Sequence, residues 1–337
     1  MAEAVTVTFV TRKLGERWRD IDSLGLPDEF PERIRSGVDV WIVSTYLELR
    51  QREASLPFRV RIASSFPRGA AVVAHRDDLR LGAFYWRSCL AAVRADRPFI
   101  HLAPWQIVQN PTQEGERALL IPSWPQPGLV PRAAGRTGVA SLGYFGRPVS
   151  LPGFFGDPAF HAELARRGIG FHCDERNWRD YSATDVCIGL RYEPDVGLAT
   201  KPYAKLVNAW LAAVPALLGP EPAYRHLRRS ELDYVEVASA RDVLAALDRL
   251  RGEPVLHAAM VENGLRRARE FTRDAVAARW AAFLQNDFLP AWRTWRGGSL
   301  LDAATGVARQ WPETRRYKRV EARQLAALLK SRAGERL

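Results

Sequence analysis

Short apolar runs recur along the first third of the chain and are separated by stretches with helical periodicity. Runs rich in β-branched residues predict strands at 5–11, 38–44, 58–63, 71–75, 99–102 and 118–121. Because strands that alternate with helices usually pair in parallel, this rhythm predicts an α/β fold with a parallel sheet.

A Pro- and Gly-rich stretch then breaks both periodicities, and we expect an interdomain linker at 123–138. The same rhythm restarts after it. Strands are expected at 139–145, 169–172, 185–190, 214–218 and 234–237, with helices between them and at 240–249 and 254–289. The predicted organisation is an N-terminal domain at 1–122, a C-terminal domain at 139–290 and a basic helical tail at 291–337. The long helical region after Pro254 indicates that the chain end returns toward the first domain.

The composition agrees with two globular cores. The chain has 337 residues, of which 47% are hydrophobic and 26% charged, and it contains eleven tryptophans. No run approaches the roughly 18 to 20 apolar residues of a membrane span, so a cytoplasmic location is expected. Three scattered cysteines, Cys89, Cys173 and Cys187, lack the paired spacing of a zinc or redox site.

A net charge of +11 indicates an anionic partner. Part of this excess lies in the tail, which also carries an apolar row at Leu325, Leu328 and Leu329. The basic residues there are Arg315, Arg316, Lys318, Arg319, Arg323, Lys330 and Arg332. One interpretation is a solvated terminal helix. The other is a helix in peripheral contact with the inner face of a membrane.

Ligands of open α/β sheets bind beyond the carboxyl ends of the strands, so the loops that follow strands are the places to search. Gly146 and Arg147 follow the expected strand 139–145. Glycine allows a ligand to approach the backbone closely, and Arg147 can pair with a phosphate. An ordinary turn that ends the strand explains the same two residues, and both interpretations stay open.

The strongest local pattern is a helix at 202–213 that leads into an apolar strand. Lys201, Lys205 and Asn208 form a row on a face separate from its apolar stripe. Lysines near a helix N-terminus oppose the helix dipole by about 0.3–1 kcal/mol each when exposed, so they require an anionic partner. A bound diphosphate would supply one, since it also accepts from the free N–H groups. A nearby side chain such as Glu193 or Asp195 is the alternative.

Beyond the same strand, Glu221 can accept hydrogen bonds from vicinal hydroxyls of a ribose or sugar, and Tyr224 or Arg225 can flank a base or phosphate. A solvated helical face is the alternative for the cluster of Arg225 with Arg228 and Arg229.

In the first half, His75 is followed by Asp77 and Asp78 at the end of a predicted strand. An ordinary imidazole pKa of about 6.5, with a carboxylate to fix the tautomer, suits a general base for an acceptor hydroxyl. We therefore name His75 and Asp77 as the candidate catalytic residues. The alternative is a structural histidine beside an aspartate that caps a helix containing Phe84 and Trp86.

The segment 201–215, with Gly219-Pro220-Glu221 after it, resembles the donor-binding region of GT-B glycosyltransferases. In that family a helix rich in small residues precedes a Gly-x-Pro-hydrophobic strand, seen here as Ala212-Ala213-Val214-Pro215-Ala216-Leu217. The linker and the strand ending at Gly146 are also similar to these proteins. The resemblance covers about residues 120–285. It implies an α/β fold of two tandem Rossmann-like domains with a cleft between them and a donor held mainly by the C-terminal domain.

The strand-end residues and the resemblance together give the candidate residues for nucleotide-sugar binding as Gly146, Arg147, Lys201, Lys205, Glu221 and Tyr224. Many retaining members carry two glutamates with seven residues between them, but those positions hold Thr200 and Asn208 here. A retaining mechanism is therefore unsupported. The expected donor-binding domain contains no Asp-x-Asp motif, since the one such tripeptide, Asp20-Ile21-Asp22, lies in the first domain. No cofactor and no obligatory metal are therefore expected. Basic side chains and a helix N-terminus would meet the charge of the leaving group.

The resemblance implies a glycosyltransferase of EC class 2.4 type that moves a sugar to a hydroxyl of a glycan, a lipid-linked sugar or a small metabolite. A nucleotide-sugar epimerase of the same fold is one alternative, although it would need acid–base residues on both faces of the sugar. A non-enzymatic binder of acidic glycan or nucleic acid is another. Its basic residues should interleave with aromatics, whereas here they lie at strand ends and in the tail. No nucleic-acid partner is expected.

Overall fold

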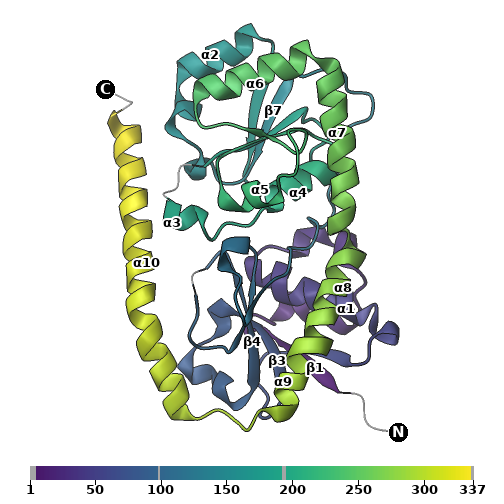
Figure 1. The fold of residues 1–337 in the computed structure, drawn as a ribbon, viewed down its shortest axis with the longest axis vertical. Helices are drawn as coiled ribbons and strands as arrows, with labels where there is room; N and C mark the ends of the chain where they lie inside the picture. The colour runs from purple at the N-terminus through teal and green to yellow at the C-terminus, as the bar shows by residue number, and fades with distance from the viewer. Residues whose placement is uncertain (1–4, 98, 192–194, 335–337) are drawn as a thin grey trace. The chain divides into compact units, whose positions relative to one another are not determined.

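The computed structural model describes residues 5–97, 99–191 and 195–334, and in its last helix only some of the side chains after residue 316. The chain divides into two compact units. Unit 1 contains Met1–Gly128 and Thr272–Lys318, and unit 2 contains Leu129–Phe271 and Arg319–Leu337. Each unit is built on its own parallel sheet (Figure 1). In the described part of the chain, no helix combines the length and the apolar character that a membrane crossing requires.

Unit 1 contains a sheet of six parallel strands in the order β2-β1-β3-β4-β5-β6. Its central strand β3 is buried along its whole length, as expected for a parallel sheet that is covered on both faces. The strands are β1 (Thr6–Val10), β2 (Arg59–Ala63), β3 (Ala71–His75), β4 (Cys89–Ala95), β5 (Trp105–Val108) and β6 (Ala118–Leu120).

The predicted strand at 38–44 is wrong, because this segment is a buried helix. A π-helical stretch (Asp39–Val43) continues directly into α1 (Ser44–Arg50). Asp39 near its start is buried and accepts hydrogen bonds from Arg17, from the Trp18 indole and from Ser36. Because almost every side of this helix is buried, its apolar residues do not recur with a helical period. The β-branched residues among them therefore predicted a strand.

The predicted strand at 99–102 is also wrong, since these residues form a turn. The strands on either side of it, β4 and β5, were not predicted. The segment after His75, expected as one helix containing Phe84 and Trp86, is a series of single 3₁₀ turns. The alanine-rich composition of β4 explains the error, because a short apolar run is compatible with either a buried strand or a buried helix.

Unit 2 contains a five-stranded parallel sheet in the order β11-β10-β9-β7-β8. The strands are β7 (Ser141–Phe145), β8 (Gly170–Asp174), β9 (Val186–Gly189), β10 (Ala216–Leu218) and β11 (Val235–Glu236). The helices are α2 (Pro158–Arg166), α3 (Asp195–Leu198), α4 (Ala204–Leu211), α5 (Pro222–Leu227), α6 (Ala240–Gly252) and α7 (Pro254–Ala268). All five strands follow the expected positions closely. Figure 1 shows α4 and α5 together near one edge of the sheet.

The helices after Thr272 belong to unit 1, whereas the sequence placed residues up to 290 in the second domain. They are α8 (Arg273–Phe283), a π-helical stretch (Leu284–Phe288), α9 (Leu289–Thr294) and the start of α10 (Leu300–Gly334). Trp280 is fully buried against Phe9 of β1, and Phe283 packs on Trp105 of β5. The helical region expected at 254–289 is interrupted where Thr272 caps α8.

Candidate functional site

The carboxyl edge of the unit 2 sheet brings together side chains from four segments. Gly146 directly follows β7, and Arg191 follows β9 by two residues. Glu221 lies beyond β10, and Lys205 projects from α4 to the same place. This edge is where open α/β sheets bind their ligands.

Lys205 is held by groups that do not neutralise its charge. Its ammonium donates to the carbonyl oxygen of Phe145 and lies 4.2 Å from the centre of the Tyr144 ring. Across the described residues, no carboxylate forms an ion pair with it. Burial, together with the Arg191 guanidinium, lowers the pKa of Lys205 to about 8, whereas Glu221 opposes the shift. The amine is therefore mostly charged at neutral pH in a place where its charge is costly.

Two glycines leave room around this amine. A side chain at Gly146 would place its Cβ 3.1 Å from Lys205 Nζ and from the Tyr144 hydroxyl. At Gly189, the last residue of β9, a Cβ would lie 2.5 Å from Leu218 and 3.4 Å from the Lys205 stem. Because glycine occupies both positions, the backbone approaches Lys205 closely.

Arg191 and Glu221 form an ion pair with a distance of 2.7 Å between Arg191 Nη1 and Glu221 Oε2. The Glu221 side chain is only 1% exposed and that of Arg191 is 10% exposed. A buried carboxylate in this position orients the arginine and stabilises its charge. The cluster thus presents two cations, Lys205 and Arg191, with one carboxylate beside them. Such a cluster can bind a phosphate or diphosphate.

Two tyrosines, Tyr144 and Tyr224, lie beside the charged side chains of the cluster. Burial raises the pKa of Tyr144 to about 12 and raises that of Tyr224 well above its ordinary value, so both stay neutral. Tyr224 is fully buried, and its hydroxyl has no hydrogen-bond partner among the described residues. That Tyr224 flanks a base stays a prediction.

The structure therefore gathers four of the six expected binding residues: Gly146, Lys205, Glu221 and Tyr224. Arg147 is exposed at the start of the loop that follows Gly146. Lys201 is half-buried and precedes α4, because that helix begins at Ala204. The row of Lys201, Lys205 and Asn208 therefore does not lie on one helix.

The sequence analysis missed Arg191 as a member of the cluster. The only signal for it was its place two residues beyond the expected strand end, which many residues share. Tyr144 was given no role either, although it lies two residues before Gly146. Sequence spacing predicts neither the contact of Arg191 with Glu221 nor that of Tyr144 with Lys205.

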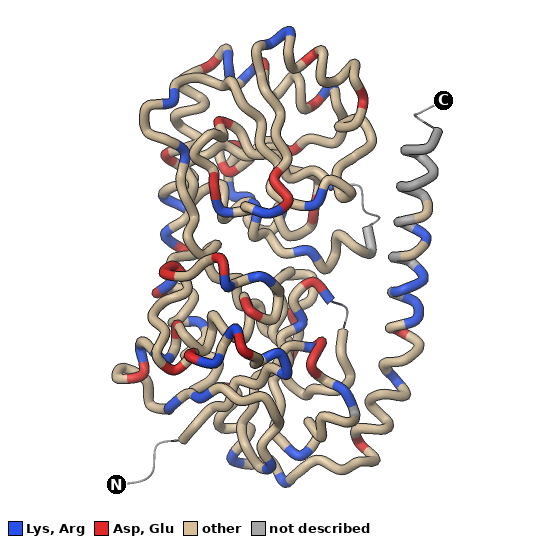
Figure 2. The backbone as a smooth tube through the Cα atoms, turned by 180° about the vertical axis from the view of Figure 1, so that it is seen from behind, with Lys and Arg blue, Asp and Glu red and all other residues tan. Residues whose placement is uncertain are grey.

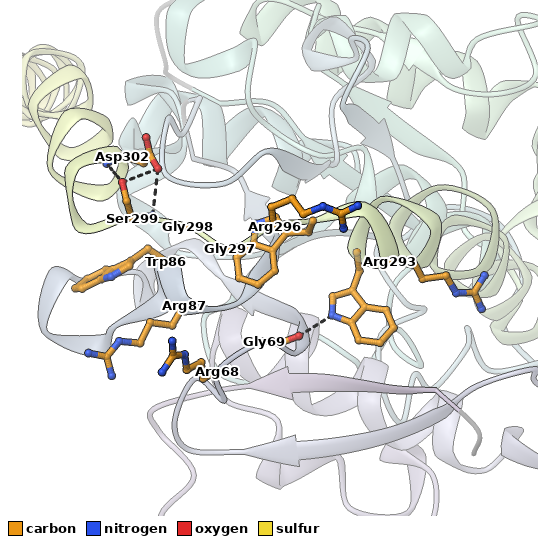
Figure 3. Close-up of a pocket in the computed structure, with 12 residues that line it drawn as sticks. Arg68, Gly69, Trp86, Arg87, Arg293, Arg296, Gly297, Gly298, Ser299 and Asp302 are labelled. Carbon is orange, nitrogen blue, oxygen red and sulfur yellow. Dashed lines mark hydrogen bonds between the residues drawn. The ribbon is translucent and has the colours of Figure 1, made fainter. Parts of the chain in front are cut away.

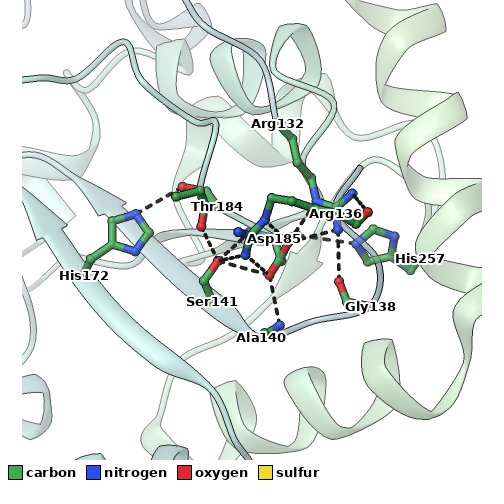
Figure 4. A network of polar contacts seen from close by, with 10 residues as sticks. Arg132, Arg136, Gly138, Ala140, Ser141, His172, Thr184, Asp185 and His257 are labelled. Atoms are coloured by element: carbon green, nitrogen blue, oxygen red, sulfur yellow. Dashed lines mark hydrogen bonds and ion pairs between the residues drawn. The ribbon is translucent and has the colours of Figure 1, made fainter. Parts of the chain in front are cut away.

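A second polar network lies at the opposite, amino-terminal edge of the same sheet (Figure 4). Asp185 is fully buried there and accepts hydrogen bonds from Arg132, from Arg136, from the Ala140 amide and from Ser141. Burial alone would raise the pKa of Asp185, but these donors lower it to about 2. The carboxylate is saturated with donors from the protein itself, so this network is structural.

In unit 1, His75 ends β3 and is buried, with 3% of its surface exposed. The expectation of an ordinary pKa is wrong, because burial lowers the pKa of His75 to about 4, against the opposing charge of Asp77. The Asp77 carboxylate lies 3.6 Å from Nδ1, and the Asp77 backbone N–H donates to the same nitrogen at 3.2 Å. At neutral pH the ring is therefore uncharged and carries its proton on Nε2.

This tautomer limits what His75 can do in the present arrangement. Its Nδ1 lone pair is already used, and Nε2 is a donor with no partner among the described residues. A base at this position would first have to release the Asp77 amide. The catalytic roles of His75 and Asp77 stay predictions, and the geometry favours donation from Nε2–H.

Among the described residues, no group of three or more His, Cys, Asp or Glu side chains is arranged to hold a metal ion. Cys89 and Cys187 are buried and Cys173 is half-buried, all three as free thiols. Burial raises the pKa of both Cys89 and Cys187 to about 11, so neither is ionised at neutral pH. Whether catalysis needs an added metal stays a prediction from the sequence.

Two Rossmann-like α/β domains in one chain define the GT-B fold, and this chain has that fold. It is similar to sucrose-phosphate synthase from Thermosynechococcus elongatus, with a TM-score of 0.54 and 11% identity over 85% of this chain and 100% of that one. At this identity the likeness is one of fold.

Two other solved structures are similar at lower scores. HepE from Anabaena, in complex with UDP and glucose, matches with a TM-score of 0.48 and 12% identity over 83% of this chain and 99% of its own. TarM matches with a TM-score of 0.45 and 9% identity over 64% of this chain, which spans about half (54%) of TarM's length. No protein-family model and no curated protein sequence matches the chain.

Proposed function

We propose that this protein is a glycosyltransferase that takes a sugar from a nucleoside-diphosphate donor and transfers it to a hydroxyl acceptor. The observation that carries this proposal is Lys205. Its buried ammonium lies at the carboxyl edge of the unit 2 sheet without an ion pair among the described residues. A buried charge is costly unless it is paired, and an anionic ligand at this edge would pair it.

The chemistry fits the charge distribution of the site. In the transfer, the bond between the anomeric carbon and the diphosphate oxygen breaks, and the acceptor oxygen forms the new bond to that carbon. The diphosphate leaves with additional negative charge. Lys205 and Arg191 would stabilise that charge, as preorganised cations do in a site shielded from water. Glu221, paired with Arg191 at 2.7 Å, keeps the arginine in position throughout.

The acceptor loses a proton in this reaction, and a base must take it. His75, with Asp77 beside it, remains the sequence-derived candidate for an inverting transfer. Its neutral ring would have to free Nδ1 from the Asp77 amide before it accepted a proton. Asp78 is also buried at this strand end, where burial raises the pKa of its carboxyl group, and it is the second carboxylate to test for this role.

Three finer expectations belong to this proposal. They are a cytoplasmic location, catalysis without a metal, and peripheral contact of the tail with a membrane. Exposed basic residues along the described part of α10 support the last of these (Figure 2). The side chains of Leu325, Leu328, Leu329, Lys330 and Arg332 lie outside the described residues. Activity in EDTA would test the second expectation, and sedimentation with anionic vesicles the third.

A panel of UDP-, GDP-, ADP- and TDP-sugars tests the central proposal. Binding to the native state alone raises the melting temperature, so a true donor shifts the melt further as its concentration rises, with the logarithm of the concentration once it exceeds Kd. Lys205→Ala should weaken the binding of that donor by roughly tenfold or more. Lys318→Ala, which removes an exposed lysine of unit 1, is the matched control and should bind normally.

The donor found in this way is then incubated with glycan, lipid-linked and small-molecule acceptors, and the products are analysed by mass spectrometry. A sugar-mass addition that Lys205→Ala lacks supports the proposal. If no nucleotide sugar stabilises the protein, or if only epimerised donor is recovered, the proposal fails. In the second case a nucleotide-sugar epimerase takes its place.

A further inference from the structure

A large pocket in unit 1 is separate from the strand ends considered above. It has a volume of about 1100 Å³ and is lined by the loops that precede β3 and β4 and by the segment between α9 and α10. Gly69 and Arg87 precede the first residues of β3 and β4 by two residues each. The pocket is therefore at the amino edge of the sheet, and the length of β3, about 13 Å, separates it from His75.

The pocket is lined mainly by arginine and tryptophan. The arginines are Arg68, Arg87, Arg293 and Arg296, and all four are exposed. The structure records no ion pair for any of them within its described residues. Figure 3 shows Arg68 and Arg87 on one wall and Arg293 on the other side. The one acidic residue of the lining, Asp302, is bound to Ser299 at the start of α10. The lining therefore has an excess of positive charge.

Three half-buried indoles, those of Trp86, Trp292 and Trp295, form the apolar part of the lining. Two close contacts fix the walls relative to each other. The Trp292 indole N–H donates to the carbonyl oxygen of Gly69 at 2.7 Å. Gly298 lies so close to Trp86 that a Cβ there would be 2.2 Å from the Trp86 carbonyl oxygen. The pocket is thus built in advance of any ligand, which lowers the entropic cost of binding.

We propose that this pocket binds an acidic oligosaccharide, one whose sugar rings carry carboxylate or sulfate groups. Guanidinium groups match such oxyanions with two parallel hydrogen bonds. Indole faces provide flat apolar surface for the C–H faces of pyranose rings. The pocket would hold a part of the glycan remote from the reacting end.

The choice of a glycan over other polyanions rests on the proposed function, because a glycosyltransferase meets glycans as acceptor or product. The concave shape also favours a glycan over a membrane surface, since the three indoles line the walls of a pocket and do not protrude from the protein surface. Exposed Leu300 and Leu301 follow the pocket at the start of α10, so anionic vesicles are one arm of the test. Single-stranded nucleic acid, which also uses stacking and basic charge, is another arm.

The experiment is calorimetric titration of the full chain with an oligogalacturonate hexasaccharide, a sulfated hexasaccharide and a neutral hexasaccharide. We expect one or both acidic hexasaccharides to bind and the neutral one not to bind. Arg68→Ala/Arg296→Ala should weaken the acidic ligand about tenfold or more, the loss expected for charge-assisted hydrogen bonds. The double variant Arg59→Ala/Arg117→Ala removes the same charge from exposed positions of the same unit and should bind within about twofold of the parent.

Trp295→Ala leaves every charge in place and should still weaken the acidic hexasaccharide, by roughly fivefold. Equal losses in the two double arginine variants, or no binding of either acidic hexasaccharide, would overturn the proposal. It would also be overturned if single-stranded oligonucleotide or anionic vesicles bound as tightly and displaced the hexasaccharide. The same preparation is titrated with the nucleotide-sugar panel. Glycan binding without nucleotide binding would leave this site standing while the transferase proposal fails, and the reverse result would overturn this site alone.

Discussion

The ammonium nitrogen of Lys205 lies 4.2 Å from the centre of the Tyr144 ring. Both groups belong to the carboxyl edge of the unit 2 sheet, where β7 ends next to α4. A ring face attracts a cation without neutralising it, and this attraction increases when water is excluded. The lysine is therefore held in place, and no carboxylate among the described residues neutralises its charge.

The first prediction concerns the stability cost of that charge. The pKa of Lys205 is lowered to about 8, so the charged form destabilises the folded state below pH 8. Lys205→Met should therefore raise the free energy of unfolding at pH 7, by roughly 1–3 kcal/mol. This gain in the free energy of unfolding should shrink as the pH rises from 8 toward 10.5, where the lysine of the unfolded chain also loses its proton. Urea unfolding of the variant and the parent protein at pH 7 and pH 10 measures the gain. A less stable variant at pH 7 would mean that the amine is a structural group.

A second prediction uses the space beside the same amine. Gly146→Ala would place a methyl group 3.1 Å from Lys205 Nζ and should weaken donor binding by roughly tenfold. Gly168→Ala is the matched control, because Gly168 also has a positive φ, +64° against +157° at Gly146, while a Cβ there meets no atom within 4 Å. Nucleotide-sugar titration and melting curves of the two variants are compared with the parent. If both variants bind alike while staying folded, Gly146 does not define the space for the ligand.

The Asp185 network gives a third prediction, about folding. Asp185→Asn removes the charge that Arg132 and Arg136 surround and should destabilise the protein by about 3 kcal/mol at pH 7. Asp248→Asn breaks an exposed pair with Arg167 and should cost less than about 1 kcal/mol. Chemical denaturation at constant pH gives both values. Similar losses of stability for the two variants would show that the buried network stabilises the fold no more than an exposed ion pair does.

The same network predicts a pH dependence. The pKa of Asp185 falls from 3.8 to about 2 on folding, so its contribution is complete above pH 4 and is lost as the pH falls toward 2. The stability difference between the parent and Asp185→Asn should therefore be constant from pH 7 to pH 5 and smaller at pH 3. A difference that instead disappears near pH 6 would point to histidine protonation as the source.

A fourth prediction concerns the tautomer of His75. The ring should carry its proton on Nε2 between pH 5.5 and 8 and should protonate only near pH 4, since burial lowers its pKa to that value. Two-dimensional ¹⁵N–¹H spectra of the imidazole report both properties, and His75→Ala assigns the signals. A midpoint near 6.5 would contradict this placement and restore the ring as a base for neutral pH.

Much of the fold could be predicted because unit 2 alternates short β-branched strands with helices of clear period. Strands β7 and β8, which pair in parallel, were both predicted from that alternation. Unit 1 was harder at two places. The helix at 37–50 is buried almost all round, so its apolar residues lost the helical period, and β4 is rich in alanine, which favours helix. The membership of α8 in unit 1 depends on Trp280 packing against β1, a contact distant in sequence.

The candidate site could be predicted only in part. Strand ends and the glycine after β7 marked the correct edge of the sheet, and Lys205 was found from its place at a helix start. Arg191 and its pairing with Glu221 were missed, because the two lie 30 residues apart and meet only through the sheet topology. The pocket rich in arginine and tryptophan was missed as well. Its run Trp292-Arg293-Thr294-Trp295-Arg296 does interleave basic and aromatic residues, but it was assigned to the tail.

The most direct test of the central claim is the uptake of protons when the diphosphate binds. At pH 8 about half of the free Lys205 side chains are neutral, since the pKa is about 8, and pairing with a diphosphate raises that pKa. Calorimetric titration with the nucleoside diphosphate at pH 8, in Tris and in HEPES, gives the number of protons taken up, because the two buffers differ in ionisation enthalpy. The parent protein should take up about half a proton, and Lys205→Ala should take up none. Uptake that persists in Lys205→Ala, or the absence of nucleotide binding in the parent protein, would contradict the account.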